Sequence, residues 1–187
     1  MELSARSLPN GGASTAPGRL RIDPREVASR LAPAVRWPGS LDMQRRTWRL
    51  MARTPDFDAW LIAWPRGGRV ELHDHGIAAG AVSVISGTLV EAVPWRDDTG
   101  RLTLVRHELW AGATLGFDVG HIHDVTNEAD GHALSLHVYS PALTSMTFYD
   151  VIGDQLSVRE VGWADDGCGE SEHGFGEGTP GAEAALR

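Results

Sequence analysis

The stretch Leu72-His73-Asp74-His75-Gly76 places two histidines two residues apart at the end of an apolar run. Side chains at positions i and i+2 of a β-strand point to the same face, so we expect His73 and His75 to face one cavity. Two imidazoles with this spacing are typical of a metal site, which needs at least one further ligand. Later in the chain, the spacing allows either His121 or His123 to complete that site.

Short apolar runs separated by turn signals fill the chain from about residue 45 onward. Residues 58–64 form a nearly continuous apolar run suited to a buried strand, and the sequence PRGG at 65–68 indicates a turn. Further strands are expected at 70–73, 81–85, 88–93, 102–109, 113–117, 133–139, 146–151 and 156–161. Many short strands at close spacing predict an all-β domain, either a sandwich or a barrel.

Changes in composition divide the chain into three parts. Residues 1–19 are rich in Ser, Gly, Pro and Ala without periodicity, so we expect them to be disordered. Asp23 as N-cap and Pro24 at the first helical position predict a short helix that ends near Pro33. We expect one domain over residues 20–163, followed by a disordered, acidic and glycine-rich tail at 164–187.

Composition excludes several classes of function. The formal net charge of −8 argues against nucleic-acid binding, which needs clustered basic side chains. The single cysteine, Cys168, excludes an internal disulfide and fits a reducing compartment. No stretch has the length and apolar character of a signal peptide or membrane span, so we expect a cytoplasmic protein without a membrane partner.

A His-x-His pair followed by a later histidine in a β-barrel resembles the cupin superfamily, whose members hold one metal ion inside a jelly-roll barrel. Cupins usually carry a glutamate a few residues after the second histidine, but residues 76–80 contain no acid. Three histidines without a carboxylate resemble the cysteine dioxygenase family of thiol dioxygenases, in its bacterial type. The resemblance covers roughly residues 45–150 and rests on the pattern Trp64-x8-His73-Asp74-His75, the run at 86–91, His123-x3-Asn127 and the string SLHVYSP at 135–141.

The resemblance implies a ligand set and a cofactor. In that family the third ligand is the histidine of His-x3-Asn, so His73, His75 and His123 would hold one Fe(II) per chain, and His121 would not be a ligand. Neutral imidazoles suit a ferrous ion and leave positions open for substrate and dioxygen. The substrate thiolate would then supply the soft ligand.

Ser135, His137 and Tyr139 alternate with apolar residues and therefore share one face of a strand. Alternation alone favours a polar face towards water or an ordinary buried hydrogen-bond chain. In the family these residues form a catalytic relay whose tyrosine hydroxyl reaches the active site, where Tyr139 would act on dioxygen or substrate and His137 would orient it.

A substrate carboxylate calls for an arginine, which the family takes from the strand before that of Trp64. Arg46 shares a face with Trp48 and Leu50 and is our first candidate, whereas Arg49 fits the family pattern if the register is shifted. Met146 is a candidate for lining the pocket, although methionine is more often core filler.

Further positions have structural interpretations. Asp74 is expected to face away from the cavity and to accept a hydrogen bond from a neighbouring strand, and Asn127 suits a turn that fixes His123. The resemblance implies a cis bond at Ser140-Pro141. It also places Gly80 where mammalian members carry a cysteine cross-linked to the tyrosine, so no cross-link is expected here.

The function that the resemblance implies is oxidation of L-cysteine to cysteine sulfinate with O2. Two alternatives remain: a dioxygenase for 3-mercaptopropionate or another small thiol, and a metal-binding cupin without oxygenase activity, such as an isomerase or sensor. The expected partners are a small thiol and O2, and the expected assembly is a monomer or small homo-oligomer.

Overall fold

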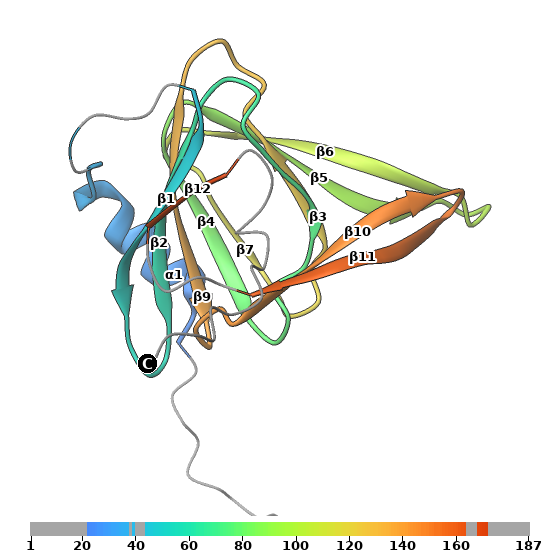
Figure 1. Ribbon diagram of the computed structural model, residues 1–187, viewed down its shortest axis with the longest axis horizontal. Helices are drawn as coiled ribbons and strands as arrows, with labels where there is room; N and C mark the ends of the chain where they lie inside the picture. The colour runs from blue at the N-terminus through green and yellow to red at the C-terminus, as the bar shows by residue number, and fades with distance from the viewer. Residues whose placement is uncertain (1–21, 38, 40–43, 164–167, 172–187) are drawn as a thin grey trace, which may run out of the picture.

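Two antiparallel six-stranded sheets form a barrel in the computed structural model (Figure 1). The structure describes residues 22–37, 39, 44–163 and 168–171. The first sheet contains, in spatial order, β12 (Cys168–Ser171), β1 (Arg46–Arg53), β2 (Asp58–Trp64), β9 (Ala133–Ser140), β4 (Ala79–Ser86) and β7 (Thr114–Phe117). The second contains β11 (Gln155–Trp163), β10 (Ser145–Ile152), β3 (Arg69–His73), β8 (His123–Thr126), β5 (Thr88–Arg96) and β6 (Leu102–Trp110). The predicted all-β class is confirmed.

A short helical segment covers the outer face of the first sheet (Figure 1). It consists of α1 (Pro24–Leu31) and the 3-10 turn η1 (Ala32–Ala34). As the sequence predicts, Asp23 is the N-cap and accepts a hydrogen bond from the backbone N–H of Arg25 at 2.9 Å. Ala28 and Ala32 pack against outward-facing side chains of β2, β4 and β9. In the described part of the chain, no helix is long and apolar enough to cross a bilayer.

This covering segment explains why the apolar run of β2 is nearly continuous. Its outward side chains, Ala59, Leu61 and Ala63, lie under residues of α1, η1 and the segment that follows. Its inward side chains, including Trp60 and Trp64, pack in the barrel core with residues of the second sheet. A strand buried on both faces needs apolar residues at every position, not only at alternate ones.

The neighbouring strand β9 is buried along most of its length in the same way. Leu136 and Val138 pack beneath the helical segment, so the alternate side chains, among them Ser135 and Tyr139, point into the barrel. The polar face of β9 is therefore an interior face and not a solvated one.

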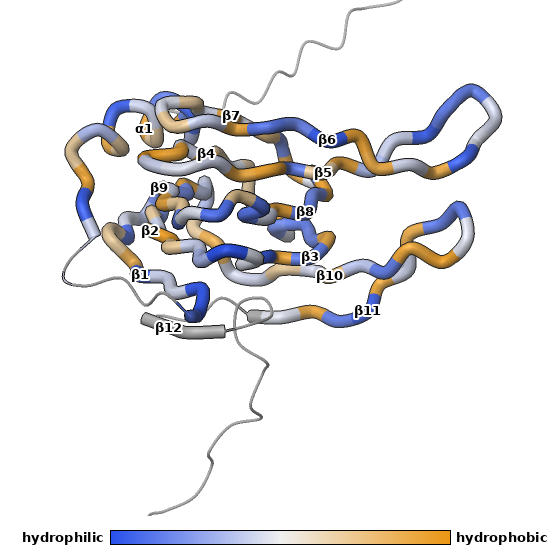
Figure 2. The backbone as a smooth tube through the Cα atoms, turned by 90° about the horizontal axis from the view of Figure 1, so that it is seen from above, coloured by the Kyte–Doolittle hydropathy of each residue, from blue (hydrophilic) through white to orange (hydrophobic). Residues whose placement is uncertain are grey.

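Two hairpins, β5–β6 and β10–β11, extend from one side of the barrel (Figures 1 and 2). The backbone N–H of Leu102 donates to Asp154 Oδ1 at 3.1 Å and links them.

The terminal segments differ in how much of them the structure describes. Residues 1–19, where we expected disorder, lie outside the described residues, as do 164–167 and 172–187. Within the expected tail, β12 pairs antiparallel with β1, so that Arg46 and Ser171 are partners. The tail lacks an apolar pattern, but backbone pairing at a sheet edge requires none.

Candidate metal centre

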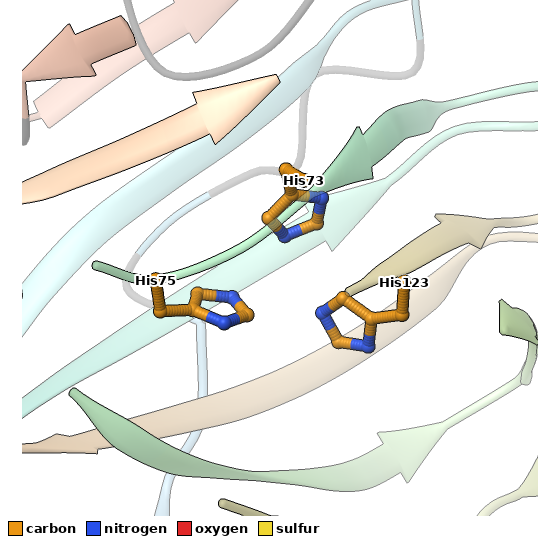
Figure 3. A group of neighbouring side chains, drawn as sticks. All are labelled: His73, His75 and His123. Atoms are coloured by element: carbon orange, nitrogen blue, oxygen red, sulfur yellow. The ribbon is translucent and has the colours of Figure 1, made fainter. Parts of the chain in front are cut away.

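Three histidines, from the end of β3, the turn that follows it and the start of β8, converge inside the barrel (Figure 3). His73 ends β3 and is the cross-strand partner of His123 on β8. Their ring centroids lie 4.7 Å apart, and that of His75 lies 4.8 Å from His73 and 5.1 Å from His123. One nitrogen from each ring lies within 4.8 Å of the other two, and all three residues are buried.

A tight turn aims His75 at the other two rings. Strand β3 ends at His73, so His75 lies just beyond it and not within a continuous strand. The carboxylate of Asp74 accepts hydrogen bonds from the backbone N–H of Gly76 at 2.9 Å and from the hydroxyl of Tyr149 at 2.6 Å. Gly76 has a φ of 57°, a conformation that favours glycine. The expected hydrogen bond from a neighbouring strand to Asp74 is confirmed, because Tyr149 belongs to β10.

Hydrogen bonds on the far side of the rings determine which nitrogens face the centre. Nδ1 of His73 lies 2.7 Å from the carbonyl oxygen of Glu71, and Nδ1 of His123 lies 2.8 Å from Oε1 of Glu91. Because both partners are acceptors, Nδ1 carries the hydrogen in each ring and Nε2 keeps its lone pair. Nε2 of His75 is buried without a hydrogen-bond partner among the described residues.

Lowered pKa values keep the imidazoles of these three residues neutral. Burial is the largest cause that lowers the pKa of His73 and His75 well below 6.5, and the neighbouring imidazoles add to the effect. Burial also lowers the pKa of His123, although its hydrogen bond to Glu91 opposes that shift. Three neutral nitrogen donors on one buried spot fit a divalent transition-metal ion.

A hydrogen-bonded row runs along β9 beside this centre. Ser135 Oγ lies 2.9 Å from Nε2 of His137, and Nδ1 of His137 lies 3.3 Å from the hydroxyl of Tyr139. The ring centroid of Tyr139 lies 4.9 Å from that of His75. The structure thus brings Ser135, His137 and Tyr139 together with the three histidines.

Burial controls the protonation of this row. It lowers the pKa of His137 to about 3, with smaller contributions from His123 and Arg46. It also raises the pKa of Tyr139. At neutral pH His137 is therefore a neutral imidazole and Tyr139 keeps its hydroxyl proton.

Arg46 projects into the barrel from β1. Its guanidinium carbon lies 5.2 Å from the ring centroid of Trp48 and 5.5 Å from that of Trp64. Burial lowers its pKa to about 10, which leaves it charged at pH 7. All three guanidinium nitrogens are buried without a hydrogen-bond acceptor among the residues that the structure describes.

Arg49 lies on the other face of β1. Its guanidinium carbon is 5.9 Å from the ring centroid of Trp37, which packs with the outward-facing cluster of Leu61 and Ala63. The alternation that pairs Arg46 with Trp48 therefore holds, and the shifted register that would bring Arg49 inward is not observed.

The remaining predicted positions also have defined places. Met146 is buried in the barrel core. The side-chain amide of Asn127 donates to the carbonyl oxygens of Trp64, Pro65 and Gly131 at 3.0, 3.1 and 2.8 Å. Asn127 therefore holds the turn that follows β8, the strand of His123. The Ser140-Pro141 bond is cis.

Gly80 is the cross-strand neighbour of Tyr139. A Cβ at Gly80 would lie 2.6 Å from atoms of the Phe117 ring and 2.9 Å from Cδ1 of Tyr139. The Phe117 ring thus occupies the space that a larger side chain at position 80 would need, and no thiol is present there.

Sequence reasoning assigned no role to Glu91, whose carboxylate contacts His123 and also His121 at 2.9 Å. The hydrogen bonds from these histidines outweigh the effect of burial and lower its pKa to about 2. The sequence does contain an indication of its role. Glu91 lies between Leu89 and Val93 on the inward face of an apolar strand, where a charged residue is unusual unless it has a specific partner.

Comparison with solved structures gives partial matches of low sequence identity. An oxalate oxidase structure is 22% identical with a TM-score of 0.39, over 44% of this chain and 41% of that chain. KdgF from Halomonas sp. is 17% identical with a TM-score of 0.44, over 58% and 87%. A cupin-superfamily sugar phosphate isomerase from Silicibacter pomeroyi is 23% identical with a TM-score of 0.46, over 72% and 82%. The chain thus spans less than half the length of the oxalate oxidase chain that it matches.

Comparison with protein families gives a match over most of the described chain. Residues 24–151 match the family described as cysteine dioxygenase type I. The matched region contains the three converging histidines, the β9 row and Arg46. Because this match covers more than half of the chain, the chain belongs to the cysteine dioxygenase type I family.

Proposed function

We propose that this chain is an iron(II)-dependent thiol dioxygenase that oxidises L-cysteine to cysteine sulfinate. The observation that supports this proposal best is the buried charge of Arg46, whose three nitrogens have no acceptor among the described residues. A buried guanidinium without an anion is costly, so a ligand carboxylate is the natural partner. A substrate with a carboxylate and a thiol fits a site that also holds a metal ion.

His73, His75 and His123 would hold the ferrous ion through their Nε2 atoms. When bound, the ion supplies adjacent positions at which a thiol sulfur and dioxygen meet. In the overall reaction the thiolate takes up both atoms of O2, so RS⁻ and O2 give RSO2⁻ and no further oxidant or reductant is needed.

Arg46 would bind the substrate carboxylate through two parallel N–H donors. The rings of Trp48 and Trp64 contact the guanidinium and limit its rotation. A fixed carboxylate at one end of a small amino acid restricts the positions that its sulfur can reach, which is the main contribution of the protein to the rate.

Tyr139 would donate its hydroxyl proton in a hydrogen bond to the bound reactants. His137 is neutral and its Nδ1 faces the tyrosine oxygen, so an Nδ1–H donates to that oxygen when Ser135 donates to Nε2. The tyrosine hydrogen is then free to point into the barrel.

Oxygen uptake by the iron-loaded protein tests the proposal, with L-cysteine, 3-mercaptopropionate and cysteamine as separate substrates. We expect one O2 consumed per cysteine and a product that is heavier by two oxygen atoms in mass spectrometry. A higher kcat/KM for 3-mercaptopropionate than for cysteine would identify 3-mercaptopropionate as the substrate instead. Absence of thiol-dependent uptake by iron-loaded protein would overturn the assignment and favour a cupin without oxygenase activity.

The single cysteine fits a reducing compartment, and the net charge of −8 argues against nucleic acid as a partner. We place the protein in the cytoplasm, acting on small molecules and not on nucleic acid, as a monomer or small homo-oligomer.

A further inference from the structure

One carboxylate oxygen joins the metal centre to a histidine outside it. Glu91 lies on β5 with 2% of its surface exposed. Its Oε1 accepts hydrogen bonds from Nδ1 of His123 at 2.8 Å and from Nε2 of His121 at 2.9 Å. Of these two imidazoles, His123 belongs to the converging group and His121 does not.

His121 fixes this carboxylate from the solvent side. Its ring stacks on Phe117 with centroids 5.2 Å apart, and Phe117 stacks on His75 at 4.8 Å. The His121 side chain is 24% exposed and faces a pocket of about 570 Å³, which is also lined by Glu91 and Trp95. His121 and Glu91 therefore both border this pocket.

The position of the carboxylate has a clear electrostatic consequence. Three neutral imidazoles leave the double positive charge of a bound metal ion uncompensated, and residues 76–80 contain no acidic ligand. An anion that accepts from Nδ1 of a ligating histidine increases electron density at Nε2 and fixes the ring in the binding orientation.

We infer that Glu91 is a positioning residue that sets the metal affinity of the centre from behind His123, and that His121 holds its carboxylate in place. The negative charge of Glu91, which acts through His123, would thus compensate part of the charge of the metal ion, as a directly bound glutamate would. The inference depends on the three-histidine site of the proposed function but not on the thiol reaction.

The test is a titration of metal-free protein with Co(II), and with Fe(II) under anaerobic conditions, against a competing chelator. Glu91→Gln keeps the shape of the side chain and removes its charge, and we expect a roughly 10- to 100-fold weaker Kd. The matched control is Glu108→Gln on the exposed surface of the adjacent strand β6, which should bind within about twofold of the wild type. Wild-type affinity in Glu91→Gln would overturn the inference.

A second variant addresses the holding role of His121. His121→Phe retains a ring that can stack on Phe117 but removes the donor to Glu91. It should weaken the Kd in the same direction as Glu91→Gln and by less than about tenfold. If Glu91→Gln does not fold, this variant decides the question, and an unchanged Kd would then overturn the inference.

A purely structural role predicts a different pattern. It would lower the Tm of the metal-free protein and leave the affinity of the folded fraction unchanged. Our inference predicts that the folded fraction of Glu91→Gln binds metal with a weaker Kd and gives a shifted visible spectrum of bound Co(II), whatever the change in its metal-free Tm. Because the titration contains neither thiol nor O2, its failure and the failure of the proposed reaction are separate results.

Discussion

The indole nitrogen of Trp64 lies 2.8 Å from the hydroxyl oxygen of Ser135. An indole N–H can only donate, so Ser135 accepts from Trp64 and keeps its own hydrogen for Nε2 of His137. The indole of Trp64 therefore sets the donor-to-acceptor direction of the hydrogen bonds that run from Ser135 through His137 to Tyr139. The same indole ring lies beside the guanidinium of Arg46, so it contacts both the relay and the proposed carboxylate site.

Trp64→Phe should slow catalysis without loss of metal. The substitution retains a ring beside Arg46 but removes the donor to Ser135, so the serine hydroxyl is free to reorient. We expect kcat with cysteine to fall by about 3- to 10-fold, compared with about 100-fold or more for Tyr139→Phe, which removes the donating group itself. Steady-state oxygen uptake at equal iron content measures both, with the exposed Trp95→Phe as control. A Trp64→Phe enzyme with wild-type kcat would show that the donor does not orient the row.

Arg46→Lys should impair use of carboxylate substrates selectively. Lysine keeps the charge but loses the two parallel donors and the planar contact with Trp48 and Trp64. Loss of one charge-assisted hydrogen bond costs about 1.5–3 kcal/mol, so kcat/KM for cysteine should fall by roughly 10- to 100-fold.

Two controls accompany Arg46→Lys: a thiol substrate without a carboxylate, and the same substitution at Arg49. Cysteamine has no carboxylate, and its low rate should be unchanged in Arg46→Lys. Arg49→Lys, on the opposite face of β1, should behave as the wild type with cysteine. A larger loss in Arg49→Lys than in Arg46→Lys would transfer the carboxylate role to Arg49.

Local sequence patterns predict much of this fold. The cap at Asp23 and the apolar run of β2 depend on a few consecutive residues, and their physical causes are local. The His-x-His pair also predicts a shared direction, although His75 reaches it through a turn after β3 and not as part of the strand.

Other features depend on residues that are distant in the sequence. Alternation places Arg46 and Arg49 on opposite faces, but only the pairing of β1 with β2 shows which face is inside. The role of Glu91 depends on its contacts with His121 and His123, some thirty positions away along the chain. Strand β12 has no apolar pattern, and its pairing depends on an edge that β1 provides.

Asn127→Asp should destabilise the fold. The side-chain amide donates to three backbone carbonyl oxygens, and an acidic side chain of the same shape cannot replace those donors. The amide has two N–H groups, so one of them is shared between two of these carbonyl oxygens. At about 1 kcal/mol for each lost donor, we expect a fall of about 2 kcal/mol in the free energy of unfolding. Urea denaturation measures it, and the exposed Glu128→Gln should change stability by less than about 1 kcal/mol. Equal stability of the two variants would contradict the role given to Asn127.

The metal-free protein should lose stability as the pH falls below 6.5. Burial holds the pKa of His73, His75 and His123 below 6.5 and that of His137 at about 3. Between these values the unfolded chain binds protons that the folded chain does not, so the free energy of unfolding decreases towards lower pH. Each histidine contributes up to about 1.4 kcal/mol per pH unit.

Urea unfolding at pH values of about 7.5, 6.5 and 5.5 measures this slope while most carboxylates stay ionised. His137→Gln should reduce the slope by the share of one histidine. A free energy of unfolding that does not vary over this range would contradict the buried, neutral state of the four histidines.

Anaerobic titration of metal-free protein with Fe(II) tests the central claim most directly, namely that His73, His75 and His123 together hold one ion. We predict one tightly bound Fe(II) per wild-type chain, retention of that binding in His107→Ala, and its loss in each of His73→Ala, His75→Ala and His123→Ala. Full stoichiometric binding of Fe(II) by folded His73→Ala, His75→Ala or His123→Ala protein would contradict the account.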